Sequence, residues 1–367
     1  MPDHRSVEFF RFGKLPLYQQ WVLLLLGSGL LSALLAKAGM PGALLLGPMV
    51  GGIIFRTNGA TVAFPELPYL AAQTLVGCFI ASKVTPQSVV GFIAQWPLLL
   101  STAVVIISSS TLLGYVMSRY RLLPGTVAIW GLSPGAASAM IVMAEAFGED
   151  IRLVAFMQYL RAVAIAVIAA ATVAIWFGAA NNSTPAVVWF PSIHVGPFLE
   201  TLAIALAGAL TAITLRIPGG MILVPFIGGA VLQATGLVAI ELPPWFMGGA
   251  IAAVGWRVGL GFTRELLWHS FRVLPWVLLS ISIMIGICGV LAWILVQWLA
   301  VDPLTALLAT APGGLDTMAV IAVSARADIA FVMALQTVRF LLVLALAPVL
   351  ARFAARHLAP RVAGDRG

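Results

Sequence analysis

The sequence predicts an all-α polytopic membrane protein built from two inverted repeats, with about ten transmembrane helices and two re-entrant Pro-Gly hairpins. Three observations lead to this prediction: a very apolar composition, a long internal repeat, and a Pro-Gly pair at the same place in both copies. Of the 367 residues, 61% are hydrophobic and 9% are charged, whereas a soluble domain carries roughly 25% charged residues. The composition therefore excludes a soluble globular protein.

The repeat is clearest in two stretches that each hold a Pro-Gly pair and end on an arginine. Ser133–Arg161 returns as Ala311–Arg339, at an offset of 178 residues and without a gap. Between Pro134 and Arg161, 10 of 28 positions are identical to their counterparts. Internal repeats are examined first because each copy is expected to form the same structural unit.

Each half of the chain offers six apolar segments in the same order. Pro41–Gly52 resembles Pro218–Gly229, and the segments that follow them also correspond. In the first half the segments are about Gln20–Lys37, Pro41–Phe55, Leu70–Val84, Trp96–Met117, Leu123–Phe147 and Leu153–Phe177. In the second half they are Pro197–Leu215, Pro218–Ala234, Trp245–Phe262, Leu274–Trp298, Pro303–Val323 and Ile329–Arg352.

These segments set the expected domain boundaries. We expect a basic N-terminal arm (1–19), membrane repeat 1 (20–178), a linker (179–195), membrane repeat 2 (196–355) and a basic C-terminal tail (356–367). Cys78 and Cys288 lie in apolar segments and are expected to be core thiols rather than a disulfide or metal framework.

The two Pro-Gly segments are expected to enter the membrane and return. The Pro-Gly pair splits Leu123–Phe147 into arms of roughly 11 residues, or about 16 Å of helix, which is half of a ~30 Å hydrocarbon core. Each half then has five crossings, and the halves are inverted. If all six segments of each half crossed instead, the halves would be parallel.

The distribution of arginine favours the inverted arrangement. With the N-terminus inside, the inner loops hold most loop arginines, while Arg326 is an exception outside. The parallel arrangement would place Arg216, Arg264 and Arg272 outside. This pattern is typical of a bacterial inner (cytoplasmic) membrane protein with both termini in the cytoplasm. The inner-loop arginines are Arg56, Arg119, Arg121, Arg152, Arg216, Arg264 and Arg272, with further arginines in the C-terminal tail.

Broken segments that meet near the midplane are the usual substrate site of a secondary transporter, and exposed helix N-termini there favour an anion. The alternative is that Pro and Gly only kink helices and let them pack closely. On the transporter interpretation the substrate-binding candidates are the residues at the two breaks and the polar residues after them. They are Ser133, Pro134, Gly135, Ser138, Gln158, Arg161, Pro312, Gly313, Gly314, Asp316, Thr317, Gln336 and Arg339.

Arg161 and Arg339 are the central candidates. Each follows a glutamine, Gln158 or Gln336, by three residues, so that each pair shares one helix face. An arginine inside the membrane is costly and is by default a functional hypothesis. Two of them can clamp a carboxylate. Alternatively each ties to hairpin carbonyls or to Asp316 or Glu145, and both roles can hold together.

The acidic residues near the breaks have two interpretations. Asp316 and, less strongly, Glu145 are candidates for the coupling-ion site, although Asp316 can equally be only the counter-ion of Arg339. Asp150 and Asp328 begin the helices that carry the arginines and are expected to be N-caps.

The motifs PGALLLGPMVGG and IPGGMILVPFIGG, together with GLSPGAASAM and TAPGGLDTM, the last two each followed by QxxR, resemble the AbrB-type membrane protein family over nearly the whole chain. This duplicated family is often labelled an ammonia monooxygenase or a regulator. It looks like a distant relative of the cation–proton antiporter and anion transporter superfamily. The resemblance implies inverted repeats with broken or re-entrant segments.

Three functions were weighed. We expect a secondary transporter of a small organic anion, with coupling to H⁺ or Na⁺ left open. An integral-membrane sensor that influences gene expression indirectly is the alternative. An ammonia monooxygenase is disfavoured, because the four histidines (His4, His194, His269 and His357) fall in termini and loops and form no paired motif on a helix. We expect no enzyme, cofactor or metal site.

Flux into vesicles, binding without flux, or metal-dependent turnover would distinguish the three functions. The expected partners are the lipid bilayer and the anionic substrate, with a homodimer left open. Direct nucleic-acid binding is not expected, because the short tails leave no room for a DNA-binding module.

Overall fold

The computed structural model describes residues 12–38, 40, 42–84, 95–134, 140, 144, 147–177, 189–217, 219–325 and 327–358. All regular secondary structure in these ranges is helical: fourteen α-helices follow a short 3₁₀ helix, Phe12–Lys14. Five α-helices are long and apolar enough to cross a membrane, and further apolar helices of 15 or 16 residues accompany them. The prediction of an all-α, multi-pass membrane protein is therefore confirmed.

The described helices fall close to the apolar segments expected from the sequence. Before the linker they are α1 (Leu17–Lys37), α2 (Ala43–Thr57), α3 (Glu66–Ala81), α5 (Trp96–Arg119), α6 (Val127–Leu132) and α8 (Ile151–Phe177). After it they are α9 (Val195–Thr214), α10 (Gly220–Ala234), α11 (Pro244–Gly259), α12 (Arg264–Ser270), α13 (Leu274–Leu299), α14 (Pro303–Thr310), α15 (Leu315–Ser324) and α16 (Ile329–Leu358). The short helix α12 was not expected.

Local chemistry explains several boundaries. α2 and α10 both begin after a glycine in the left-handed region, Gly42 with φ +70° and Gly219 with φ +66°, a conformation that glycine adopts without steric cost. α14 begins at Pro303, and the Asp302 carboxylate accepts hydrogen bonds from the backbone N–H of Leu304 and Thr305 at 3.1 and 3.0 Å. A proline at the first position after an Asp cap is a strong helix start.

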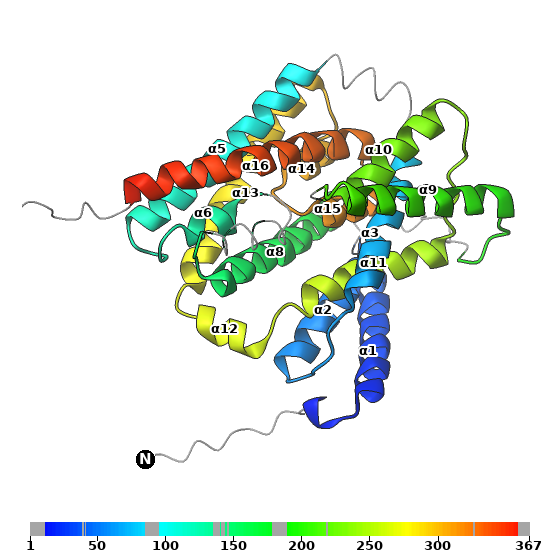
Figure 1. The fold of residues 1–367 in the computed structure, drawn as a ribbon, viewed down its shortest axis with the longest axis horizontal. Helices are drawn as coiled ribbons and strands as arrows, with labels where there is room; N and C mark the ends of the chain where they lie inside the picture. The colour runs from blue at the N-terminus through cyan, green and yellow to red at the C-terminus, as the bar shows by residue number, and fades with distance from the viewer. Residues whose placement is uncertain are drawn as a thin grey trace, which may run out of the picture.

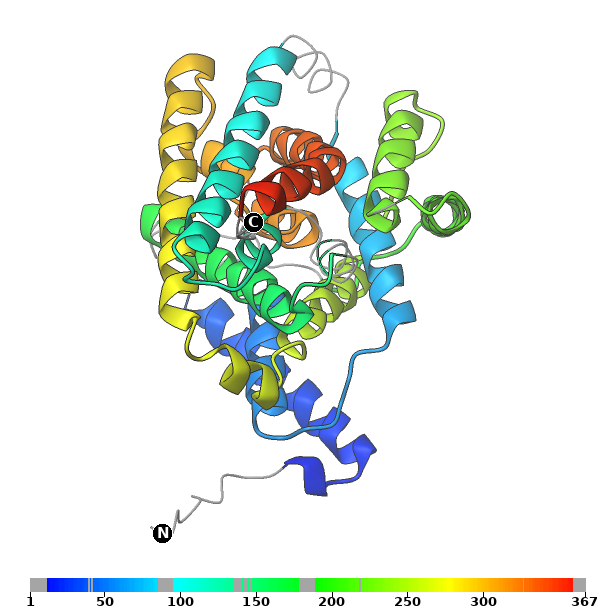
Figure 2. The ribbon, with the colours of Figure 1, turned by 60° about the vertical axis from the view of Figure 1, so that its left-hand side comes forward.

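The helices form two bundles, and each bundle takes helices from both sides of the linker. The glycine-rich bundle contains α1, α2, α3, α9, α10 and α11; the hairpin bundle contains α5, α6, α8, α12, α13, α14, α15 and α16. Figure 2 shows α5 and α13 side by side on one side of the molecule, with α9 and α10 on the other. In Figure 1 α14 and α15 lie near the centre. The bundles meet where α2, α3 and α11 approach α8, α15 and α16.

Glycine lets the backbones of the glycine-rich bundle approach closely. A Cβ atom on Gly259 of α11 would lie 2.1 Å from the Met49 carbonyl oxygen of α2, and one on Gly77 of α3 would lie 2.5 Å from the Ile222 carbonyl oxygen of α10. Membrane helices have little hydrophobic driving force to associate in lipid, so this close van der Waals packing stabilises the bundle.

We therefore expect Gly259→Ala to lower the stability of the protein by about 1–3 kcal/mol, the typical cost of forcing an extra methyl group into a packed interface. Thermal unfolding of the purified protein in detergent measures the change. Gly249→Ala on the same helix is the matched control, because a Cβ atom there meets nothing within 4 Å. Equal unfolding temperatures for the two variants would contradict the packing argument.

Candidate functional site

The second Pro-Gly segment is a helix that breaks in mid-course. α14 ends at Thr310, residues 311–314 are not helical, and α15 begins at Leu315. The break leaves the last carbonyl groups of α14 without partners from the helix itself. In a membrane such groups must be satisfied by other parts of the protein.

Gln336 and Arg339 on α16 supply the missing donors. The Gln336 amide donates to the carbonyl oxygens of α14 and the break, and the Arg339 guanidinium donates to two carbonyls at the break and to the Gln336 amide oxygen. The Gln336 contacts are with Leu308, Ala309 and Ala311, at 3.0, 3.2 and 3.0 Å. The Arg339 carbonyl contacts are with Ala311 and Gly313, at 2.7 and 2.9 Å.

The first Pro-Gly segment is held in the same way. After α6 ends at Leu132, Gln158 and Arg161 of α8 donate to its last carbonyls, and Arg161 also donates to the Gln158 amide oxygen at 2.7 Å. The Gln158 contacts are with the carbonyl oxygens of Trp130 and Ser133, at 2.8 and 3.2 Å. The Arg161 contacts are with those of Gly131, Leu132 and Ser133, at 3.4, 2.9 and 2.9 Å.

These contacts confirm one of the two roles expected for the arginines, the tie to hairpin carbonyls. All four side chains are buried, with exposed fractions of 0–3%. The C-terminal carbonyls of a helix carry partial negative charge, so a guanidinium there is favourable both as a donor and as a cation. The other role, binding an anion, is not tested by these contacts.

The Nε–H donor of each guanidinium is unused among the described residues. The Nε atoms of Arg161 and Arg339 are buried and have no hydrogen-bond partner among the described residues. The two guanidinium groups are close enough to repel each other electrostatically, and the Cys288 thiol of α13 lies within electrostatic reach of both. No acidic side chain in the described part of the chain pairs with either arginine. Two buried like charges are costly unless a counter-ion or a bound anion joins them.

In each Pro-Gly segment, further hydrogen bonds join the start of the segment to the start of the long helix that follows it. We call this end of the segment its base. The Glu149 carboxylate accepts from the backbone N–H and the hydroxyl of Thr126, at 2.8 and 2.6 Å. In the other segment the Thr305 hydroxyl accepts from the backbone N–H of Asp328 at 3.0 Å. In each case the partners are 23 residues apart in the sequence.

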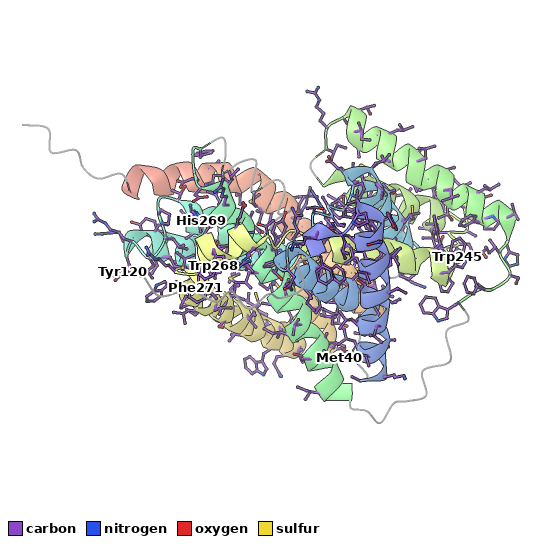
Figure 3. All side chains as sticks on the ribbon, turned by 90° about the horizontal axis from the view of Figure 1, so that it is seen from below. Met40, Tyr120, Trp245, Trp268, His269 and Phe271 are labelled. Atoms are coloured by element: carbon purple, nitrogen blue, oxygen red, sulfur yellow. The ribbon has the colours of Figure 1, made fainter. Side chains whose placement is uncertain are left out.

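Asp150 and Asp328 cap the helices that carry the arginines, as expected. The Asp150 carboxylate accepts from the backbone N–H of Arg152 at 2.9 Å, and that of Asp328 accepts from Phe331 at 3.0 Å. Asp150 also contacts the His269 ring nitrogen of α12 at 2.8 Å. Figure 3 shows His269 beside Trp268 and Phe271 at this end of the molecule.

These contacts set the pKa of Asp150. Partial burial raises the pKa, but the hydrogen bonds from His269 and from the backbone N–H of Arg152 and Leu153 outweigh burial, and the pKa of Asp150 falls below its ordinary value.

The remaining sequence candidates are placed as follows. Ser133, Pro134, Pro312, Gly313 and Thr317 are buried at the two breaks, and Gly314 is half-buried. The Ser133 hydroxyl donates to the Ile129 carbonyl at 2.7 Å and so serves its own helix. Asp316 lies in the first turn of α15, but its side chain is outside what the structure describes. Gly135, Ser138 and Glu145 lie outside the described residues.

Sequence reasoning missed Glu149 and Thr305. The prediction that Cys288 is a core thiol is confirmed, since Cys288 is buried and free. Its α13 backbone carbonyl also accepts from the Thr310 hydroxyl at 3.1 Å, which fixes it beside the second break. The 23-residue spacing of Thr305 and Asp328 carries no pattern of its own, so only the fold reveals it. Among the described residues no group of three His, Cys, Asp or Glu can hold a metal ion.

Comparison with known proteins identifies the family. Residues 44–355 match the family described as "Transition state regulatory protein AbrB". The chain is 43% identical over 345 residues to an Escherichia coli (strain K12) protein described as "Putative regulator AbrB", covering 94% of this chain and 99% of that one. It is 26% identical over 249 residues to the uncharacterized protein YhjN of Bacillus subtilis (strain 168), covering 64% of this chain and 65% of YhjN. The chain therefore belongs to the AbrB family.

The tie predicts that Gln336→Leu destabilises the protein by about 1–3 kcal/mol, because it leaves buried carbonyls without a donor. Thermal unfolding in detergent measures the loss. Gln297→Leu on α13 is the control, because Gln297 is exposed. If both variants unfold at the wild-type temperature, the amide does not hold the break.

The Asp150 cap predicts a pH-dependent contribution to stability. Since the folded-state pKa lies below the ordinary value of 3.8, the ionised carboxylate stabilises the fold above about pH 4, and this stability is lost as the pH falls through the folded-state pKa. Asp150→Asn should therefore unfold more readily than wild type at pH 7, and the difference should shrink as the pH falls below 3.8 and through the folded-state pKa. Glu200→Gln, at an exposed site on α9, should show no such crossover. A difference that stays constant with pH would exclude the carboxylate as its cause.

Proposed function

We propose that this AbrB-family protein is a secondary transporter of a small organic anion, with H⁺ or Na⁺ as the candidate coupling ion. The observation that carries the proposal is the pair of buried arginines, Arg161 and Arg339, which repel each other and each keep an unused Nε–H donor. An anion placed between them would accept those donors and neutralise the repulsion.

The hydrogen bonds at the base of each Pro-Gly segment support re-entrant hairpins. A straight helix of 23 residues is about 34 Å long, yet Thr305 and Asp328, 23 residues apart, are hydrogen-bonded. The chain between them must turn back. Its tip is held by Arg339, about 11 residues or roughly 16 Å along α16, which is near the middle of a ~30 Å core.

The first hairpin is related in the same way, with Thr126 and Glu149 at its base and Arg161 at its tip. The two arginines at the hairpin tips lie within electrostatic reach of each other. This favours a shared central site, as expected of inverted repeats in a transporter. We propose this inverted arrangement in the bacterial inner membrane, with both termini in the cytoplasm. The excess of arginine in the expected inner loops supports the orientation.

Within this proposal the residues at the breaks contact the substrate, and Asp316 in the first turn of α15 is the coupling-ion candidate. The protein is a carrier rather than an enzyme. The ammonia monooxygenase label would require clustered metal ligands, and the described residues form no such cluster.

A membrane sensor is the second candidate, because the Escherichia coli relative is described as a regulator. A sensor would bind the same anion at the same arginines but would not move it across the bilayer. Flux therefore separates the two functions, and binding does not.

The test is uptake of a panel of labelled small carboxylates into vesicles that contain the purified full-length protein. We expect flux of at least one anion, and its loss in the double variant Arg161→Gln with Arg339→Gln. Because the arginines also hold the hairpins, only variants that keep wild-type thermal unfolding are informative.

Arg161→Lys with Arg339→Lys is the companion variant: it keeps both charges and should retain more binding than the glutamine pair. Asp316→Asn should abolish accumulation driven by an ion gradient while exchange of substrate across the membrane persists. Full flux in a folded double-glutamine variant would refute the arginine site. Binding without flux would favour the sensor.

A further inference from the structure

A groove separate from the arginines runs between the two bundles. It has a volume of about 530 Å³ and is lined by side chains from positions 226–234 of α10, from its C-cap Thr235, from positions 330–338 of α16, and by Val84 just after α3. This volume falls within the roughly 300–1,000 Å³ typical of ligand sites. The lining is hydrocarbon apart from two threonine hydroxyls.

The groove is open to the surroundings of the protein. Ile227 and Val231 of α10 line it and are 51% and 58% exposed. Because α10 and residues 329–343 of α16 are apolar helices of a multi-pass membrane protein, we expect lipid rather than water around the groove. An unfilled groove would forfeit dispersion contacts along both helices, so an apolar chain from the bilayer is the natural occupant.

The groove does not open onto the arginines. Gln336 and Arg339 bind the carbonyls of α14 and the break after it, whereas the groove takes other positions of α16, such as Ala330, Ala334 and Val338, opposite α10. A ligand in the groove therefore occupies a site distinct from the proposed anion site.

A basic residue lies next to a lining residue of the groove in the sequence. Lys83 precedes the lining residue Val84, is exposed, and lies with its Nζ 5.2 Å from the centre of the Phe79 ring. The ion pairs among the described residues are those of His194 with Glu241 and of His269 with Asp150, so Lys83 has no acidic partner there. A basic residue near the membrane surface attracts anionic lipid headgroups.

We propose that the groove between α10 and α16 holds one acyl chain of a phospholipid with an anionic headgroup, and that Lys83 binds the headgroup. Thr235 needs no polar ligand, because its hydroxyl donates to the Val231 and Leu232 carbonyls at 3.0 Å. The Thr337 hydroxyl, which also lines the groove, is buried without a partner among the described residues. A ligand with a polar inner end would hydrogen-bond to this hydroxyl, whereas an acyl chain would not.

Native mass spectrometry of the full-length protein, released from nanodiscs of phosphatidylglycerol mixed with phosphatidylcholine, tests the proposal. Wild type should retain one phosphatidylglycerol. Ala230→Phe fills the groove and should abolish retention, whereas Leu210→Phe, on the exposed face of α9, should not. Lys83→Gln should reduce the preference for phosphatidylglycerol about fivefold and leave retention of some phospholipid intact. Matching thermal unfolding shows that each variant is folded.

Thr337→Val replaces the unpartnered hydroxyl by a methyl group and should leave lipid retention unchanged or higher. A fall in retention would show that the occupant places a polar group there and would overturn the acyl-chain assignment. Equal retention by Ala230→Phe and wild type would place the lipid elsewhere. A dimer that Ala230→Phe dissociates would show that a second copy of the chain covers the groove, and this too would overturn the proposal.

Discussion

The hydrogen bonds from a glutamine and an arginine to the carbonyls of a broken helix are the interaction on which the rest of this structure depends. A break in mid-membrane exposes backbone groups that lipid cannot satisfy. Gln336 and Arg339, spaced three residues apart on one face of α16, satisfy those of α14, and Gln158 and Arg161 do the same for α6. Short helices such as these, of eight and six residues, are marginal alone. Their position therefore depends on the long helices that carry the donors.

The same arginines explain why a structural tie and an anion site need not compete. The terminal nitrogens of each guanidinium donate to protein carbonyls and to a glutamine amide oxygen, which fixes its orientation. The Nε–H of each has no partner among the described residues. A fixed donor binds with little loss of side-chain entropy. The carbonyls offer partial charges only, so two full positive charges remain close together in a buried setting. In the proposed transporter, an anion bound between the two arginines would relieve this repulsion, and that relief would contribute to its binding energy.

The sequence alone predicted much of this arrangement, because the repeat places equivalent residues in equivalent environments. The all-helical membrane class, the end of α6 before Pro134, the break at Pro312, and the caps at Asp150 and Asp328 follow from local composition and spacing. The contacts of Glu149 with Thr126 and of Thr310 with the Cys288 carbonyl could not be predicted, because they join segments that no periodicity relates. The division into bundles was also beyond the sequence, since a repeat does not say which helices of the two copies pack together.

That division has a mechanical consequence. The hydrogen bonds to the ends of α6 and α14 come from α8 and α16, inside the hairpin bundle. Moving one Pro-Gly segment by itself would leave several buried carbonyls and a buried arginine without their hydrogen-bond partners, at a cost of several kcal/mol. Sliding the whole hairpin bundle against the glycine-rich bundle would break none of these bonds. The groove between α10 and α16 is lined by hydrocarbon, so motion there exchanges one apolar contact for another. A conformational change that slides one bundle against the other is therefore far less costly than one that moves a single Pro-Gly segment.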